Sequence, residues 1–169
     1  MRIEKFIVAV AAGSLSMAVQ AAEPVLMAKP VPFVDANQIA GNIKRECTIQ
    51  DQLADYINEY AREHRIDIRF AAEVTPQSAA QVLDIHIDES ISQGNPFIGH
   101  RKSTTAIGKL YRDGELVASF TARRDSMGGM FAGYKGSCSV LGRTVKALGK
   151  DIAAWLLAPQ MDAQLGDLG

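Results

Sequence analysis

The sequence predicts an α+β fold: a mostly antiparallel sheet of four to five strands with two helices packed on one face. Two segments carry apolar residues at helical spacing, and the segments between them alternate apolar and polar residues as half-buried strands do. Because each of these elements has one apolar face, two helices on one side of an antiparallel sheet bury all of the faces together.

The composition is that of a globular protein. The chain has 169 residues, with 18 Lys and Arg against 19 Asp and Glu, and 47% of its residues are hydrophobic. This length suits one domain, and the hydrophobic content excludes intrinsic disorder and a disulfide-dense mini-protein. A formal net charge of -1 argues against nucleic acid as a partner, because nucleic-acid-binding proteins carry a basic excess.

Residues 1–21 have the pattern of a secretory signal peptide. Arg2 and Lys5 precede an uncharged apolar run that ends in small residues around Ala21. The run has about 14 residues, fewer than the roughly 20 that span a bilayer, and no later run is suited to spanning one. We therefore expect a periplasmic or secreted protein with no transmembrane segment after signal removal. An uncleaved N-terminal anchor is the alternative.

The first part of the mature chain is expected to lie outside the domain. Residues 22–46 contain three prolines and predict an extended N-terminal arm, in which residues 31–34 suit an edge strand. A single α+β domain is then expected over residues 47–159. Its first helix begins at Ile49, after Thr48, because threonine favours the N-cap position and apolar residues recur from there at helical spacing.

Two strands are expected next, because residues 66–70 and 83–87 alternate apolar and polar side chains. In the second strand, Asp84, His86 and Asp88 share one face. A metal site there needs a further ligand at a matching spacing, and no second histidine provides it. We therefore interpret this face as a solvated sheet surface, with no metal and no cofactor expected.

A hairpin is the clearest local signal. Residues 104–112 and 115–124 are strand-like and are joined by Asp113 and Gly114, which accept the positive φ angles of a type I′ turn.

The last predicted helix follows a glycine-rich segment. Apolar residues recur at helical spacing over residues 141–156, and the helix is expected to end before Pro159. Residues 160–169 are expected to form a flexible tail.

The two cysteines, Cys47 and Cys138, precede the first helix and begin the last. In an exported protein an even number of cysteines favours a disulfide. The closed loop of about 90 residues is worth roughly 4.6 kcal/mol in the chain-entropy model. The bond would place the N-termini of the two helices together, with the helices side by side and roughly parallel. A redox-active thiol pair lacks the spacing it needs, and two free thiols are the remaining alternative.

The glycine-rich segment over residues 126–136 is the candidate partner-binding surface. Glycines make it adaptable, and Met130, Phe131, Tyr134 and Lys135 offer apolar and charged contacts. The alternative is that its aromatic residues pack over the end of the core.

A positive patch is expected beside this segment. Arg123 and Arg124 leave the hairpin where residues 100–102 enter it, and Lys135 follows in the loop. Arg123, Arg124 and Lys135 are therefore the candidate anion-binding residues, although ordinary surface charge explains them as well.

The stretch IGKLYRDGELVASF, followed by GGMFAGYKGSCSVLGRTVKALGKDIAAWL, resembles uncharacterised exported bacterial envelope proteins. The order of elements is also similar to that of small envelope domains such as the N-terminal domain of TolB and the YajG-type lipoproteins. This chain departs from the lipoproteins because it has no cysteine near the signal sequence for lipid attachment. The resemblance implies a fold and an envelope setting and carries over no catalytic residue.

Two functional hypotheses follow. The first is a non-enzymatic periplasmic protein that binds an envelope protein or a second copy of itself. The second is a small hydrolase or ligand-binding protein that uses the sheet face around His86. No GxSxG, HExxH or paired-carboxylate motif supports an enzyme. A pocket at His86 would favour the second hypothesis, whereas an open face without a pocket would exclude this hypothesis.

The first prediction concerns processing at the N-terminus. The mature protein recovered from the periplasm should begin at Ala22 or Glu23, because the small residues that signal peptidase reads end there. Intact-mass measurement of the fractionated protein tests this. A periplasmic species that retains Met1 contradicts it.

Overall fold

The computed structural model describes residues 23–95, 99–126 and 137–169. The elements of these residues are, in chain order, β1 (Val25–Ala28), α1 (Gly41–Glu46), α2 (Ile49–Glu63), β2 (Ile68–Ala71), β3 (Gln81–Asn95), β4 (Gly99–Arg112), β5 (Glu115–Ser126), α3 (Ser137–Trp155) and β6 (Ala163–Gly166).

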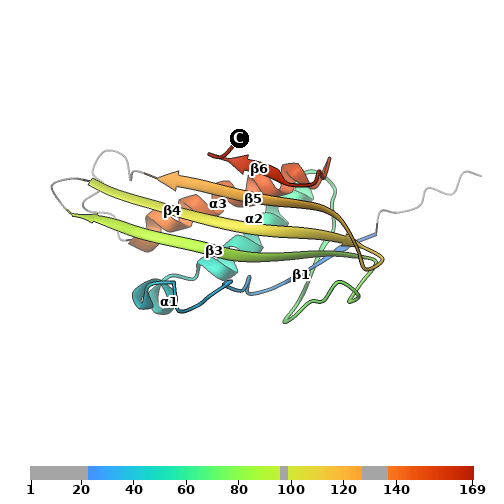
Figure 1. The fold of residues 1–169 in the computed structure, drawn as a ribbon, viewed down its shortest axis with the longest axis horizontal. Helices are drawn as coiled ribbons and strands as arrows, with labels where there is room; N and C mark the ends of the chain where they lie inside the picture. The colour runs from blue at the N-terminus through green and yellow to red at the C-terminus, as the bar shows by residue number, and fades with distance from the viewer. Residues whose placement is uncertain (1–22, 96–98, 127–136) are drawn as a thin grey trace, which may run out of the picture.

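The strands form one mixed sheet in the order β2-β1-β3-β4-β5-β6 (Figure 1). The long strands β3, β4 and β5 are antiparallel neighbours, whereas β1 runs parallel to both β2 and β3, and β6 runs parallel to β5. The α+β class is confirmed. The expected four- to five-stranded, mostly antiparallel sheet with two helices was only roughly right, because the described residues form six strands and three helices.

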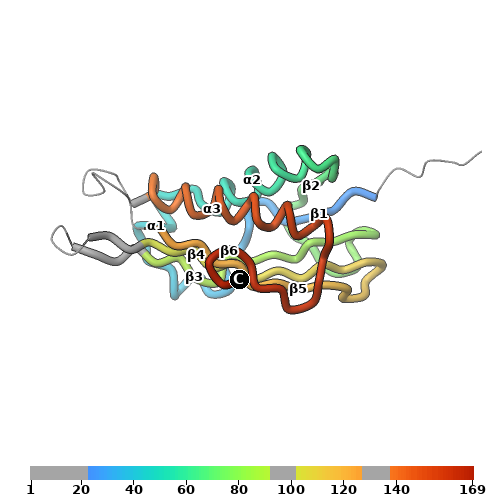
Figure 2. The backbone as a smooth tube through the Cα atoms, turned by 90° about the horizontal axis from the view of Figure 1, so that it is seen from above, coloured from blue at the N-terminus to red at the C-terminus, as the bar shows by residue number. Residues whose placement is uncertain are grey.

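The parallel pairs arise because helices separate their strands. A parallel neighbour requires a crossover connection, which a hairpin cannot supply. Here α1 and α2 connect β1 to β2, and α3 connects β5 to β6. Helices α2 and α3, one from each crossover, lie together on one side of the sheet (Figure 2).

The N-terminal arm predicted over residues 22–46 was wrong in part, because its residues 25–28 contribute an inner strand to the sheet. β1 lies between β2 and β3, with Val25 paired to both Ile68 and Gln81. Further along, Phe33 forms a parallel bridge to Ile87 in β3. The run VLMA is apolar throughout, with three of its residues buried and Leu26 half-buried, so it shows no alternation.

The predicted flexible tail was also wrong in part. Residues 163–166 form β6, in which Ala163 pairs with Phe120 and Gly166 pairs with Arg123. The N–H of Asp167 donates to the carbonyl of Arg123 at 2.8 Å and continues this attachment. Four residues are too few to show a strand pattern in the sequence.

The predicted hairpin is confirmed. Asp113 and Gly114 have φ angles of 51° and 82°, as a type I′ turn requires. Strand β3 extends to Asn95, which pairs with Gly99 of β4. A register shift between Ile87 and Glu89 marks a bulge in β3.

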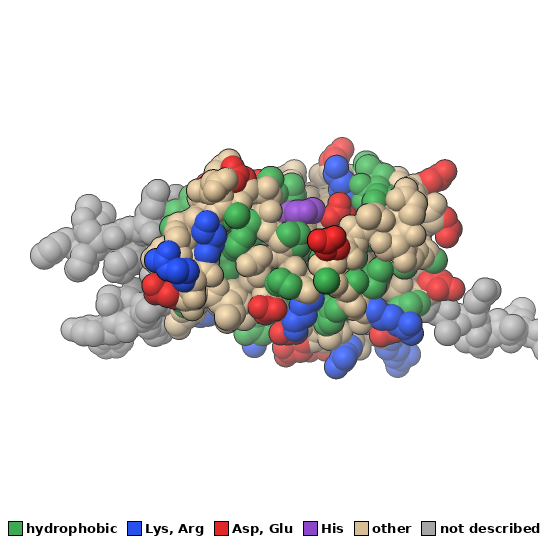
Figure 3. Space-filling view, turned by 90° about the horizontal axis from the view of Figure 1, so that it is seen from below, with side chains coloured by type: hydrophobic (Ala, Val, Ile, Leu, Met, Phe, Trp, Pro, Cys, Tyr) green, Lys and Arg blue, Asp and Glu red, His purple; other side chains and the backbone are tan. Residues whose placement is uncertain are grey.

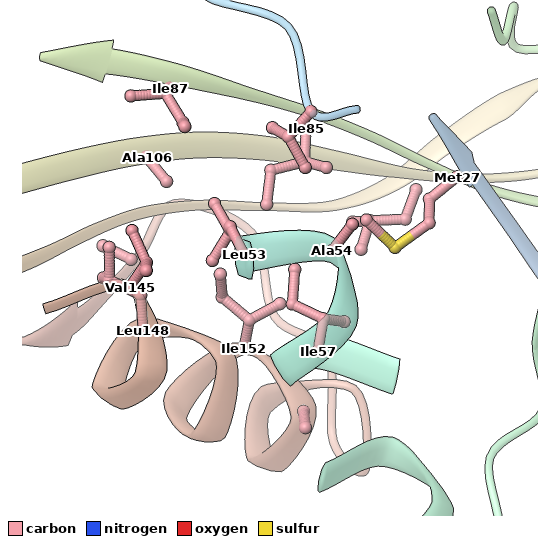
Figure 4. Packing of buried hydrophobic residues seen from close by; sticks show 14 of the residues in the cluster. Met27, Leu53, Ala54, Ile57, Ile85, Ile87, Ala106, Val145, Leu148 and Ile152 are labelled. Carbon is pink, nitrogen blue, oxygen red and sulfur yellow. The ribbon is translucent and has the colours of Figure 1, made fainter. Parts of the chain in front are cut away.

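The core lies between the helices and one face of the sheet (Figure 4). Buried side chains of α2 and α3 recur at the predicted helical spacing and meet the inward-facing residues of the strands. Thr48 precedes α2 as predicted, but its side chain makes no capping hydrogen bond to the helix backbone. The labelled core residues are Met27, Leu53, Ala54, Ile57, Ile85, Ile87, Ala106, Val145, Leu148 and Ile152.

The two long helices touch closely where α3 carries a glycine. A Cβ atom on Gly149 would lie 2.6 Å from the Cβ of Tyr56 in α2, so no larger residue fits without moving the helices apart. At the C-terminal end of α3, the ring of Trp155 makes an edge-to-face contact with the ring of Phe120, and the two ring centroids lie 4.8 Å apart.

A disulfide joins Cys47 and Cys138, whose Cα atoms lie 5.0 Å apart. It links the residue before Thr48, at the start of α2, to the second residue of α3. The helices run side by side in the same direction, as the expected pairing implies (Figure 2).

The second prediction concerns this bond. Replacing Cys47 or Cys138 with serine should lower the free energy of unfolding by about 2–5 kcal/mol, because the unfolded chain loses a long covalent loop. Chemical denaturation under non-reducing conditions measures the change. The double variant should match each single variant, and two alkylatable thiols in the unreduced, denatured wild type would contradict the prediction.

Candidate functional site

A groove of about 500 Å³ lies on the sheet face opposite the helices. Its floor is formed by the outward-facing side chains of β3, β4 and β5, which alternate with the core residues of the same strands. Its rims include Val34, in the segment between β1 and α1, and Asp162, in the segment before β6. The lining includes Val34, Asp84, His86, Ile107, Lys109, Ser119, Thr121, Asp162 and Gln164.

Strand register arranges the floor in two rows. In the first row, Lys109 lies between Asp84 on β3 and Ser119 on β5. In the second row, Ile107 lies between His86 and Thr121, and Thr121 is in turn paired with Gln164 of β6. The groove therefore combines one basic, two acidic and several hydroxyl or amide groups around a small apolar centre.

Two contacts fix polar side chains in the groove. The Ser119 hydroxyl donates to Asp162 Oδ1 at 2.9 Å, and the Asp162 backbone N–H donates to Ser119 Oγ, also at 2.9 Å. On the other side, His86 Nδ1 lies 3.5 Å from Asp84 Oδ1, a distance at which protonation of the imidazole would create an ion pair. The prediction that His86 and Asp84 share a strand face is confirmed, and the face is hollowed rather than open.

In this groove, Ser119 and His86 do not form a pair of nucleophile and base. Strand β4 separates Ser119 from His86, and the two residues lie in different rows, so their backbones lie roughly 11–12 Å apart. A serine nucleophile needs its base within hydrogen-bond reach, and Ser119 instead bonds Asp162. Within the described residues, no three His, Cys, Asp or Glu side chains gather in a way that holds a metal ion.

Arg124, one of the candidate anion-binding residues, is engaged in ion pairs within the fold. Its guanidinium bonds Asp151 of α3 through two nitrogens, at 2.7 and 2.8 Å, and Asp167 through the third, at 2.8 Å. The hydrogen bonds to Asp151, together with both carboxylate charges, raise the pKa of Arg124. The Nη2 atom of Arg123 lies 3.4 Å from Oδ1 of Asp125. Each of the three guanidinium nitrogens of Arg124 is thus bonded to a carboxylate of the same chain.

Lys102 does not contribute to a surface patch either. Its side chain is buried, with 3% of the residue exposed, and this burial lowers its pKa. On the surface visible in Figure 3, basic and acidic side chains are interspersed, without a large area of one sign.

The predicted partner-binding residues lie outside the described residues. Met130, Phe131, Tyr134 and Lys135 belong to residues 127–136, so their roles stay predictions.

Sequence reasoning missed the rims of the groove. Val34 and Asp162 belong to the segments interpreted as an arm and a tail, and Ser119 shows no motif. The alternating pattern around His86 was the one signal that pointed to this surface.

Comparisons with known proteins define the fold. No family model and no curated protein matches the chain. The hypothetical protein CT253 from Chlamydia trachomatis is 12% identical with a TM-score of 0.54, over 80% of this chain and 96% of that one. Protein XCC0632 from Xanthomonas campestris is 16% identical with a TM-score of 0.53, over 82% and 85%.

A third similar structure is the PelC dodecamer from Paraburkholderia phytofirmans, which is 14% identical with a TM-score of 0.50, over 79% of this chain and 89% of that one. These bacterial proteins share the fold at low identity. The likeness to the TolB N-terminal domain stays a prediction. Of the helices in the described part of the chain, none has the length and apolar character needed to cross a bilayer.

The third prediction concerns Asp167. The hydrogen bond from the Asp125 backbone N–H, followed by the contact with Arg124, lowers the pKa of Asp167 below its ordinary 3.8. Its stabilisation is therefore complete above pH 3.8 and is lost as the pH falls through the lowered value. Asp167→Asn should reduce Tm by about 1–3 °C at neutral pH, the effect of a half-exposed ion pair.

Thermal melts from pH 7 to pH 2 test this expectation. The difference in Tm between wild type and Asp167→Asn should shrink below pH 3.8. Asp113→Asn is the matched control, since Asp113 lies exposed in the hairpin turn and asparagine accepts its positive φ. A difference that does not change with pH contradicts the assigned role.

Proposed function

We propose that this protein is exported to the cell envelope and acts there as a non-enzymatic binding domain. The observation that carries the proposal is the sheet face opposite α2 and α3, which is hollowed into a groove of about 500 Å³. Its serine and histidine are too far apart to act as nucleophile and base, so the surface is suited to holding a molecule rather than to transforming it.

Two features support the envelope setting. The pattern of residues 1–21 is that of a signal peptide. The bond between Cys47 and Cys138 is of the kind that persists in oxidising compartments such as the periplasm.

We further propose that residues 127–136 dock a partner through Met130, Phe131, Tyr134 and Lys135. The partner is an envelope protein or a second copy of this chain. PelC, with a similar fold, is described as a dodecamer, which supports self-association. The sheet also has two outer strands, β2 and β6, that leave backbone groups available for pairing with another chain.

A ligand-binding role for the groove is the second candidate, and the groove itself favours it. The face around His86 combines concave shape, apolar surface from Ile107 and several polar groups, the usual composition of a small-molecule site.

The fourth prediction tests the docking segment. Phe131→Ala should leave Tm nearly unchanged and abolish partner capture from envelope extract. Leu116→Ala is the matched control, because Leu116 is 44% exposed at the far end of the hairpin. Pull-down and light scattering, run together, identify whether the lost partner is another protein or a second copy.

The competing explanation predicts a different result. If Phe131 fills the core, its truncation should cost about 3–5 kcal/mol of stability, and the loss of capture would follow from unfolding. A strongly lowered Tm for Phe131→Ala therefore contradicts docking through this side chain.

A further inference from the structure

Lys109 is the basic group at the centre of the groove. It sits in register between Asp84 and Ser119, and its side chain points into the solvent-facing hollow. Asp84 has its Oδ1 3.5 Å from His86 Nδ1. Within the described residues, the Lys109 ammonium makes no hydrogen bond or ion pair. A cation left without a partner in a concave site favours a ligand that carries a carboxylate.

Asp162 is the acidic group on the far rim, and its position is fixed. The Ser119 hydroxyl bonds its Oδ1, and its own N–H bonds Ser119 Oγ. Its φ angle of 53° is one that few residues other than glycine adopt, and asparagine and aspartate adopt it most readily. Its second carboxylate oxygen, Oδ2, accepts no hydrogen bond within the described residues. A carboxylate that is fixed in position in this way is suited to accepting a hydrogen bond from the ammonium group of a ligand.

The spacing of the residues that carry these two charges indicates the size of the ligand. The backbones of Lys109, Ser119 and Asp162 form one row across β4, β5 and the segment before β6, so these backbone positions span two strand spacings, roughly 9.5 Å. An extended peptide covers about 3.3–3.6 Å per residue, and about three residues match this span. The volume of about 500 Å³ lies within the range of small-ligand sites.

We propose that the groove binds a short zwitterionic peptide of about three residues, with its C-terminal carboxylate at Lys109 and its N-terminal ammonium near Asp162. Ile107, beside this row, contacts an apolar side chain of the peptide. The proposal rests on the ligand-binding candidate function. A free amino acid is too short to reach both charges, and a diamine or a dicarboxylate matches only one of them.

Titration of the purified protein with the tripeptide Ala-Leu-Ala tests the proposal. Binding is followed by calorimetry and by backbone amide shifts in NMR spectra. The shifts should concentrate at Lys109, Ser119 and Asp162. N-acetylation or C-amidation of the peptide should each weaken binding about tenfold, because each removes one charge-assisted hydrogen bond.

Variants assign each end of the peptide to one side chain. Lys109→Ala should weaken binding of Ala-Leu-Ala about tenfold and make it insensitive to amidation. Asp162→Asn should likewise weaken binding about tenfold and make it insensitive to acetylation of the peptide. The asparagine keeps an acceptor for the Ser119 hydroxyl, and it tolerates the positive φ angle at this position. Lys150→Ala, on the exposed face of α3, is the matched control and should bind like wild type.

Three outcomes overturn the proposal: no shifts at the groove, equal binding of the blocked and free peptides, or equal binding of a diamine or dicarboxylate of the same length. The partner-capture experiment on Phe131→Ala is independent of this titration. Captured partner without peptide binding would therefore reject the peptide and leave the proposed binding domain standing.

Discussion

The packing of α2 and α3 against a single face of the sheet is the interaction on which the rest of the structure depends. Both helices belong to crossovers that create parallel strand pairs, so the helices and the two outer parts of the sheet form together. The close approach at Gly149 and Tyr56 brings the helices near enough to cover the strands as one layer. Because this layer of helices covers only one face of the sheet, the opposite face carries polar residues and the groove.

The C-terminal segment is held in the fold by charge as well as by pairing. Arg124 joins Asp151 of α3 to Asp167 beyond β6, so one guanidinium connects a helix, a strand and the end of the described chain. Gly166 makes this possible, since its φ of 74° is a left-handed conformation and an added Cβ would overlap the Arg123 carbonyl oxygen. The same C-terminal segment places Asp162 in the lining of the groove. The attachment of residues 160–169 to the sheet and the shape of the groove are therefore linked.

The sequence predicted those elements whose pattern is periodic. The helical stripes of α2 and α3, the alternation around His86 and the Asp113-Gly114 turn each follow from local chemistry, and the lone cysteine pair predicted its own bond. The errors concern segments whose structure depends on contacts with distant parts of the chain. β1 is apolar at all four positions and shows no alternation, and β6 is too short to have a period. Arg124 was interpreted as a surface cation because its carboxylate partners lie 27 and 43 residues away along the chain.

The single disulfide also determines how many ways the chain can be oxidised. With two cysteines in the sequence, Cys47 and Cys138 have only one intramolecular product, and that product is the native bond. Oxidation of this chain therefore needs an electron acceptor but no reshuffling of wrong pairs within the molecule. The remaining incorrect products are intermolecular, and their formation depends on how many unfolded chains meet before the partner 91 residues away is brought near by folding.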